Sequence, residues 1–415
     1  MQPNRPQISD MNLQTGSRVP LMRVWASLAC ALPRYRRQLL VSTGSFLLVT
    51  SAASIMSMAA SPVQAHAAGM PGPWPARHRS RSKADVLTLN ARCESCHSEI
   101  AAEWRASYHA KAYTDSAFQR ALAIEPLPFC KGCHAPEANP NVAEDPRLAS
   151  LGVGCVSCHV VDGAVLATRA NSRSAEHPVL RLAQFGGAAA CANCHQFAFP
   201  GETMASGVAP MQGTIMEHAA SDYAQVSCAD CHMPKTAGGR ASHRFDVTRN
   251  EALMRAAVSV EARRTDSQGV ELSLRAKGVG HAFPTGDLFR RLEITAEALG
   301  PEQSKMAGEV AYLTRRFKTM RSAGGLLRRV SVGDDRLGVK DESRRTIQLD
   351  LGPDAAKWPI VWRLAYQRVE HPGMVGQPDA EVDGEIELAR GVLAPGPSLH
   401  RVVAPGPQVQ FPKSH

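Results

Sequence analysis

Cys93-Glu-Ser-Cys96-His97 is the first of five Cys-x-x-Cys-His units in this chain, and all five lie within 140 residues. This spacing is the attachment signal of c-type haem, in which two thiols bond to one porphyrin and the next residue, histidine, binds the iron. The sequence therefore predicts five covalently attached haem c groups. The cysteines expected to hold them are Cys93, Cys96, Cys130, Cys133, Cys155, Cys158, Cys191, Cys194, Cys228 and Cys231. The expected proximal iron ligands are His97, His134, His159, His195 and His232.

The cysteine count favours haem over two alternatives. A zinc half-site or a redox or structural dithiol also uses Cys-x-x-Cys, but neither requires a histidine after every second cysteine. Ten of the 11 cysteines belong to the five units, and only Cys30 lies outside them. Zinc and disulfide bonds remain the alternative interpretations.

Five haem groups within 140 residues leave about 28 residues for each group. Aromatic residues make up only 5% of the 415-residue chain. We therefore expect porphyrin, rather than packed side chains, to fill the core of this region. Such a region should not fold without its cofactors.

Residues 1–67 predict an export signal. Three arginines at 34, 36 and 37 precede a weakly apolar run from Leu39 to Ala60, and Ala65-His66-Ala67 fits the rule for cleavage after Ala67. The alternative is an uncleaved membrane anchor, since the run of 22 residues is long enough to span a bilayer. Seven serine and threonine residues in the run argue against a permanent span. We expect a periplasmic protein, and peripheral membrane association stays open.

The formal charge of +9 does not indicate nucleic-acid binding. Removing residues 1–67 leaves 41 basic and 37 acidic residues, and the haem propionates add further negative charge. The sequence also has no basic stretch with interleaved aromatic residues. The expected partners are redox proteins, such as a membrane quinol oxidoreductase or another cytochrome, and the oligomeric state stays open.

The expected fold class is α+β. A loop-rich, mainly α-helical multihaem cytochrome c domain is followed by an antiparallel β-sandwich-like domain. The expected boundaries are a flexible leader at 68–87, the haem domain at 88–249, the β-sandwich-like domain at 250–394 and a loose tail at 395–415. Within the haem domain, Glu99 to Arg105 predicts a short helix on which Trp104 covers a porphyrin face.

Apolar and polar residues alternate in six segments after residue 250, and this period of two indicates half-buried strands. Gly, Pro and Asp turns separate the segments, which favours a small antiparallel sandwich. The six segments are 258–262, 270–274, 292–296, 347–351, 362–366 and 386–388.

The second axial ligand of each iron decides whether a haem is a closed carrier or open to small molecules. Five histidines remain as candidates once the motifs, the signal, the leader and the distant C-terminal part are set aside. These candidate distal ligands are His109, His177, His218, His243 and His281. Met204 and Met211 are alternative ligands, although a buried core methionine is the more ordinary interpretation.

A weak internal repeat relates two of these regions. Glu103-Trp-Arg-Ala-Ser107-Tyr-His109-Ala110 aligns with Glu217-His-Ala-Ala-Ser221-Asp-Tyr223-Ala224, so that Glu, Ser and Ala match. Tyr223 takes the place of His109 in the second copy, and His218 takes the place of Trp104. This replacement is the only sequence feature that points to an open iron.

The chain resembles the multihaem cytochromes of the cytochrome c-554 and hydroxylamine oxidoreductase-like group. The similar segments include Trp104-x-x-Ser-x-His109, Gly152-Val-Gly-Cys155, Met211-Gln212-x-Thr214, His281-x-Phe-Pro-Thr-Gly-Asp287 and Asp335-Arg336-Leu337. The resemblance implies a periplasmic electron-transfer protein with closely stacked haem groups. Some members of the group are enzymes that act on hydroxylamine, nitrite or related nitrogen compounds. This chain differs from those enzymes because it has five haem sites rather than eight and lacks a Cys-x-x-Cys-Lys variant.

The predicted function is the relay of electrons through closely spaced covalent haem groups, with no catalytic residue assigned. The first alternative is a multihaem oxidoreductase with one open haem that acts on a small nitrogen or sulfur compound. The second is a docking or adaptor protein in which the β-domain binds a partner.

Overall fold

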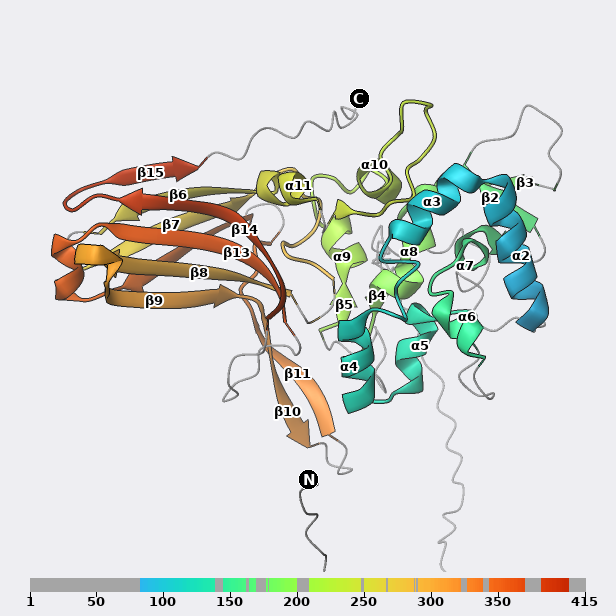
Figure 1. Ribbon diagram of the computed structural model, residues 1–415, viewed down its shortest axis with the longest axis horizontal. Helices are drawn as coiled ribbons and strands as arrows, with labels where there is room; N and C mark the ends of the chain where they lie inside the picture. The colour runs from blue at the N-terminus through green and yellow to red at the C-terminus, as the bar shows by residue number, and fades with distance from the viewer. Residues whose placement is uncertain are drawn as a thin grey trace, which may run out of the picture. The chain divides into compact units, whose positions relative to one another are not determined.

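The computed structural model contains helices that precede a set of antiparallel sheets, so the α+β fold class is confirmed (Figure 1). It describes residues 83–138, 145–161, 164–168, 177, 179–199, 209–247, 250–265, 268–286, 288, 290–321, 327–338, 343–369 and 382–402. All of these residues belong to one unit that spans Ala59–His415. The expected signal peptide lies outside the described residues.

Short helices form the N-terminal part of this unit. They are α2 (Lys83–Cys96), α3 (Ser98–Ala106), α4 (Ser116–Ile124), α5 (Pro128–His134), α6 (Pro146–Ser150), α7 (Cys155–His159), α8 (Ala188–His195), α9 (Thr214–Ala219), α10 (Cys228–His232) and α11 (Glu251–Ala256). Short strands lie between them: β1 (Val160–Val161), β2 (Ala164–Ala167), β3 (Val179–Arg181), β4 (Gln196–Phe197) and β5 (Gln212–Gly213). The helix expected at Glu99 to Arg105 is α3.

Local sequence explains where several of these helices begin. Asp115 caps α4 by accepting a hydrogen bond from the main-chain N–H of Phe118. Ser227 and Asp230 form a reciprocal capping box at the start of α10. Such caps satisfy N–H groups that have no partner inside the helix, and each is typically worth about 1 kcal/mol.

The largest side-chain cluster of the helical part is small. Its buried members are Val86, Ala135, Ala138, Leu148 and Ala149, three of them alanine. Clusters of this size bury little apolar surface, which is the main source of folding free energy. The cluster agrees with the expectation that side chains alone do not supply the core of this region.

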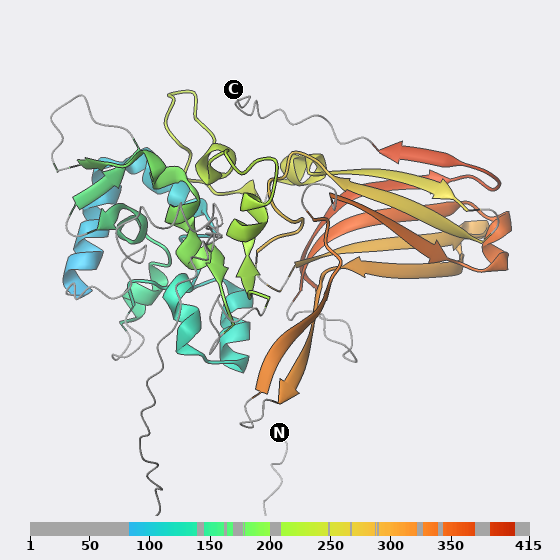
Figure 2. The same cartoon turned by 180° about the vertical axis from the view of Figure 1, so that it is seen from behind.

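Two four-stranded antiparallel sheets form the C-terminal part (Figure 2). One sheet has the order β12-β7-β6-β15, and the other has the order β14-β13-β8-β9. The strands are β6 (Val258–Arg264), β7 (Gly269–Ala276), β8 (Arg290–Leu299), β9 (Lys305–Leu313), β12 (Arg344–Asp350), β13 (Ile360–Val369), β14 (Val382–Leu393) and β15 (Leu399–Val402). One hydrophobic cluster takes buried residues from both sheets, among them Leu272, Leu274, Ile294 and Trp362.

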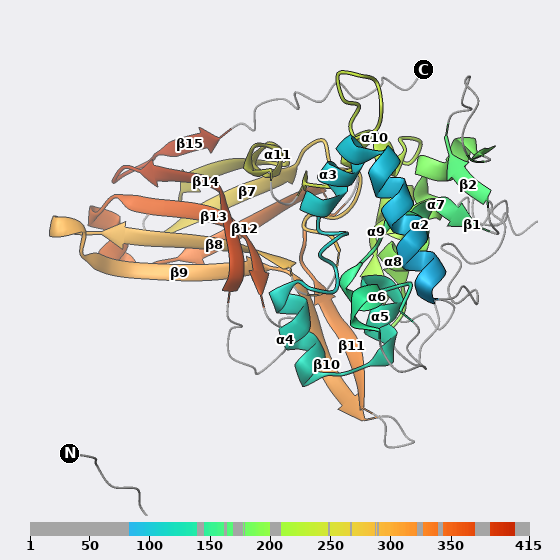
Figure 3. The same cartoon turned by 45° about the vertical axis from the view of Figure 1, so that its right-hand side comes forward.

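All six strands expected from alternation are present, as β6, β7, β8, β12, β13 and β14. Four further strands were not expected. Along β9, Lys305, Met306, Glu309 and Val310 are all exposed, so no period of two in hydrophobicity marks this edge strand. The arginine-rich hairpin of β10 (Arg315–Arg321) and β11 (Leu327–Asp334) extends away from the two sheets (Figure 3).

The structure corrects two segments that were expected to be irregular. Helix α2 begins at Lys83, inside the expected leader, and Val86 is buried against Leu148 and Ala149. Strand β15 lies inside the expected loose tail, where residues 399–402 pair with β6. In both cases the expected irregularity came from composition, whereas contacts with distant residues decide the structure.

Ion pairs attach α4 to the strands. Arg120 of α4 lies 2.6 Å from the Asp383 carboxylate on β14. Arg368 on β13 also contacts Asp383, and it lies 3.8 Å from Asp115 at the start of α4. The helical and strand parts therefore share charged contacts. Within the described part of the chain, no helix is long and apolar enough to cross a membrane.

Candidate haem-binding sites

Each Cys-x-x-Cys unit lies at the C-terminal end of a helix. Four of the units complete α5, α7, α8 and α10, and the first ends α2 with Cys96, just before His97. Residues three apart in a helix lie on the same face, so both thiols of a unit can reach one porphyrin edge. None of the ten motif cysteines, all of them among the described residues, forms a disulfide bond. The helices therefore present the thiol pairs in the arrangement that covalent attachment requires.

Four motif histidines each face a second histidine across a similar gap. The ring centroids are 6.4 Å apart for His97 and His177, and 6.2 Å apart for His159 and His243. They are 6.3 Å apart for His195 and His109, and 6.1 Å apart for His232 and His281. The structure thus brings four of the five candidate distal histidines opposite four different motif histidines.

The size of this gap fits one iron between two imidazoles. A transition metal binds imidazole nitrogen at about 2 Å, and a ring nitrogen lies roughly 1 Å from its own centroid. Two imidazoles on opposite sides of one iron therefore have centroids about 6 Å apart. The observed spacings of 6.1–6.4 Å match this value.

Hydrogen bonds at Nδ1 fix the orientation of several of these rings. The Nδ1 atoms of His159 and His134 lie 2.8 Å and 2.7 Å from the carbonyl oxygens of Leu166 and Ala112. His243 and His281 make the same kind of contact with Ala241 and Ala282, at 3.1 Å and 2.9 Å. When Nδ1–H donates to a carbonyl oxygen, Nε2 keeps the lone pair that binds a metal.

Burial favours the neutral form of five imidazoles in these pairs. It lowers the pKa of His109 to about 3 and that of His232 to about 4. Burial also lowers the pKa of His159, His243 and His281. Because histidine binds metal in its neutral form, this environment suits axial ligation.

The remaining motif histidine, His134, has an aromatic neighbour. Its ring stacks on Phe118 of α4 with centroids 3.8 Å apart and planes 8° apart. The phenyl ring thus lies flat against the imidazole face, while Nδ1 points to Ala112. No feature of the sequence pointed to Phe118, because the contact joins two helices.

His218, the fifth candidate distal ligand, lies in a different environment. Its imidazole hydrogen-bonds main-chain groups of Tyr223 and Val226. A Cβ at Gly280 would lie 3.3 Å from the His218 ring and 2.8 Å from Tyr223 Cβ, so both residues lie beside the loop that carries His281. The structure therefore places His218 beside the His232–His281 pair.

Met211 packs against a small apolar cluster of Phe199, Leu288 and Phe317. This position corresponds to the ordinary interpretation of a core methionine. Met204 lies outside the described residues, as do His66, His78, His371 and His415.

Thiols of different motifs lie next to one another. The Cys93 side chain is hydrogen-bonded to that of Cys155, and Cys191 is hydrogen-bonded to Cys228. Cys133 Sγ also lies 3.9 Å from the main-chain oxygen of Asn193, between the cysteines of the fourth unit. The attachment points of the first and third units, and of the fourth and fifth, are therefore adjacent.

Comparison with known proteins bears on the class of protein to which these motifs belong. Residues 92–160 match the family model described as cytochrome c554 and c-prime. No match is found among the curated proteins. This family match and the similarity in fold to a solved penta-haem cytochrome both support a multihaem c-type cytochrome, the class that the motifs predicted.

The fold is similar to that of a penta-haem cytochrome c552 from Thermochromatium tepidum, with a TM-score of 0.56. The two chains are 19% identical, and the match covers 75% of this chain and 97% of the other.

Proposed function

We propose that this protein is a periplasmic pentahaem cytochrome c that relays electrons through closely spaced covalent haem groups. In this proposal the ten motif cysteines attach five haem c groups and the five motif histidines are the proximal ligands. His177, His243, His109 and His281 are the distal ligands opposite His97, His159, His195 and His232. A haem domain at 88–249 and a β-sandwich-like domain at 250–394 complete the proposed organisation.

The observation that carries the proposal is the set of four histidine pairs at 6.1–6.4 Å. An iron held by two imidazoles is six-coordinate and low-spin, which suits electron transfer rather than substrate binding. The thiols of the first and third motifs are adjacent, as are those of the fourth and fifth. This supports the proposed close spacing of the haem groups, because adjacent thiols bring porphyrin edges close together. Close redox centres in a protein shell are what a relay requires.

Haem c, when bound, supplies a one-electron redox centre. The chain orients His134, His159, His243 and His281 through Nδ1. It also holds attachment points of different motifs together. The proposed partners are a membrane quinol oxidoreductase or another cytochrome.

Low-temperature EPR of the oxidised holoprotein tests the proposal. We expect low-spin signals that nitrite and cyanide leave unchanged at the four paired haem groups. A high-spin signal of one haem that shifts when ligand is added would instead support the oxidoreductase with an open iron. High-spin signals from several haem groups would contradict the proposed ligand pairs.

A further inference from the structure

Glu103 and Glu217, which align in the weak internal repeat, each bind the main chain beside a candidate distal histidine. Glu103 on α3 accepts a hydrogen bond from the main-chain N–H of His243 at 2.9 Å. Glu217 on α9 accepts one from the main-chain N–H of Ala282, directly after His281, at 3.3 Å. The two copies of the repeat therefore provide a carboxylate with the same kind of contact at two different sites.

An arginine completes each arrangement. Arg240 donates from both terminal nitrogens to Glu103, at 2.8 Å and 2.9 Å. Arg336 donates to Glu217 at 2.7 Å. The side chains of Glu103 and Glu217 are only 16% and 18% exposed, so water screens these ion pairs weakly. Charge-assisted hydrogen bonds of this kind are among the strongest that side chains form.

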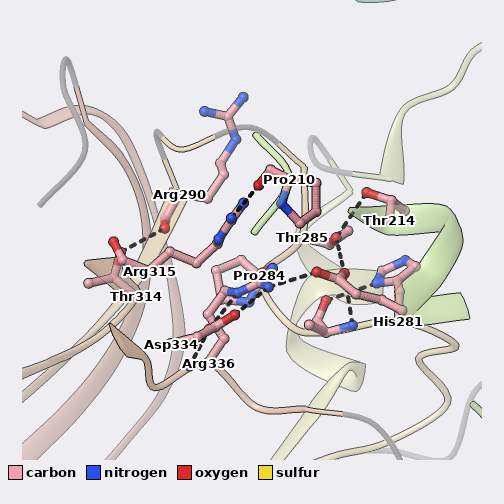
Figure 4. Close-up of polar contacts among 12 residues, drawn as sticks. Pro210, Thr214, His281, Pro284, Thr285, Arg290, Thr314, Arg315, Asp334 and Arg336 are labelled. Carbon is pink, nitrogen blue, oxygen red and sulfur yellow. Dashed lines mark hydrogen bonds and ion pairs between the residues drawn. The ribbon is translucent and has the colours of Figure 1, made fainter. Parts of the chain in front are cut away.

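Each arginine is also connected to the loop that carries its candidate distal histidine. Arg240 precedes His243 by three residues in the same loop. Arg336 follows strand β11, where Asp334 binds it at 2.8 Å and 2.9 Å, and it donates to the carbonyl oxygen of Pro284 at 3.0 Å (Figure 4). Arg336 thus connects the hairpin with the loop that contains His281.

The loop after His281 is held from two sides. Thr285 donates to Glu217 at 2.5 Å. Thr285 also lies 3.0 Å from Thr214 Oγ1 (Figure 4). On the other side, Phe283 and Leu337 exchange main-chain hydrogen bonds of 2.7 Å and 3.0 Å. The loop therefore has little freedom to move relative to α9.

The imidazole orientation depends on these loops. Nδ1 of His243 and Nδ1 of His281 each bond to a carbonyl oxygen of the same loop, at Ala241 and Ala282. A displaced loop therefore displaces the ring and its Nε2. Groups that orient a metal ligand in this way typically change metal affinity by 10- to 100-fold when they are removed.

We propose that Glu103 and Glu217 are positioning residues that hold His243 and His281 at the axial sites opposite His159 and His232. This inference rests on the proposed function, because it takes the two histidines as iron ligands. The repeat then has a physical meaning, since it supplies one carboxylate clamp for each of two distal-ligand loops.

The test uses the full-length holoprotein with Glu103→Gln or Glu217→Gln, each of which keeps the side-chain shape and removes the charge. Glu293→Gln is the matched control, because Glu293 is 16% exposed and pairs with Arg363 at 3.2 Å, within the sheet of β8 and β13. Cyanide binding and EPR are measured after haem content has been shown to be complete. Cyanide must displace the distal histidine, so we expect about tenfold tighter binding, or more, at one haem of each clamp variant. The control should match the wild type.

The affected haem should differ between the two variants. Glu103→Gln should change the signal that His243→Ala removes, and Glu217→Gln the signal that His281→Ala removes. Added imidazole should restore the low-spin spectrum of His243→Ala and of His281→Ala. If both glutamine variants carry their full haem content and bind cyanide with the same affinity as the wild type, the inference is overturned.

Two further outcomes separate the inference from the proposed function. If His243→Ala and His281→Ala leave every haem unchanged, the proposed ligand pairs are wrong. If these variants alter a haem but the glutamine variants do not, only the clamp is wrong. Should Glu217→Gln accumulate without full haem content, Thr285→Val removes one donor to the same carboxylate. Wild-type cyanide binding in Thr285→Val would then overturn the inference at that site.

Discussion

Gly152 lies against the main chain of His109, and a Cβ at this position would be 2.6 Å from the His109 carbonyl oxygen. Gly152 has a φ of +61°, a conformation that is unfavourable for residues with a Cβ. The next residue, Val153, donates its N–H to the same oxygen at 2.9 Å. The turn before the third motif therefore fixes the backbone of the histidine that faces His195.

Gly152→Ala should destabilise the holoprotein and disturb the haem between His109 and His195. The left-handed backbone alone costs about 1–2 kcal/mol, and the close contact adds to this. Gly239→Ala is the control, because its φ is +74° but no atom of the described residues lies within 4 Å of its added Cβ. Urea unfolding and EPR check the prediction, and equal effects of the two variants would contradict it.

Replacing Cys155 and Cys158 together by alanine should reduce the haem content by one group per chain. In the proposed function the thiols of this unit attach one haem, and Cys155 also contacts Cys93 of the first unit. Mass spectrometry and the absorbance of the reduced haem measure the loss. Cys30→Ala should keep the full content, because this cysteine lies in the expected signal peptide. Unchanged haem content in the double variant would favour the zinc or disulfide alternative.

His281→Ala and His218→Ala should differ in their effect on haem spin state. His281 faces His232 at 6.1 Å, whereas His218 is bound to main-chain groups beside this pair. We expect His281→Ala to convert one haem to a high-spin form that imidazole reverses, and His218→Ala to keep the low-spin spectrum. EPR of both variants decides between them. A high-spin haem in His218→Ala would identify His218 as the distal ligand instead.

Asp383→Asn should loosen helix α4 from the strands. The substitution removes the charge that Arg120 and Arg368 share, and hydrogen bonds to charged groups contribute about 2 kcal/mol each. Because Phe118 of the same helix stacks on His134, the absorbance of one haem should shift as well. Glu261→Gln, at an exposed ion pair with Arg401, is the control and should change stability by less than about 1 kcal/mol.

The lowered pKa of Asp383 predicts part of the loss of folding stability at acid pH. Burial alone would raise the pKa of Asp383, but the hydrogen bonds from Arg120 and Arg368 hold it below the usual 3.8. Its contribution to stability is therefore present above about pH 4 and is lost as the pH falls through the lowered pKa. Urea unfolding of wild type and Asp383→Asn should give curves that converge on acidification. A difference that grows as the pH falls would contradict this assignment.

The sequence predicted local features well and the long-range pairing poorly. Cys-x-x-Cys-His is a local pattern, and alternation along strands such as 258–262 is local as well. The partner of each motif histidine is not local, because His109 follows the first motif but faces His195 of the fourth. His177 follows the third motif and faces His97 of the first. The packing of segments that are distant in sequence, including the loops that carry the distal candidates, determines these pairs.

Two kinds of site residue could not be recognised from the sequence, for similar reasons. Phe118 and Phe245 contact His134 and His109 from separate segments, and neither belongs to a motif. Glu103 and Glu217 were visible in the repeat, but their role depends on Arg240 and Arg336, which come from later parts of the chain. A repeat identifies equivalent positions, whereas the reason for their equivalence is a three-dimensional contact.

Strand β15 gives the molecule an order of assembly. It follows every other described strand along the chain, yet it pairs with β6, the first strand after the helices. The sheet that begins at residue 258 is therefore completed only when residue 402 has been delivered. The five Cys-x-x-Cys-His units, at residues 93–232, come before every strand of these two sheets. In a chain that emerges from its N-terminus, their thiols are therefore exposed before the sheets can close.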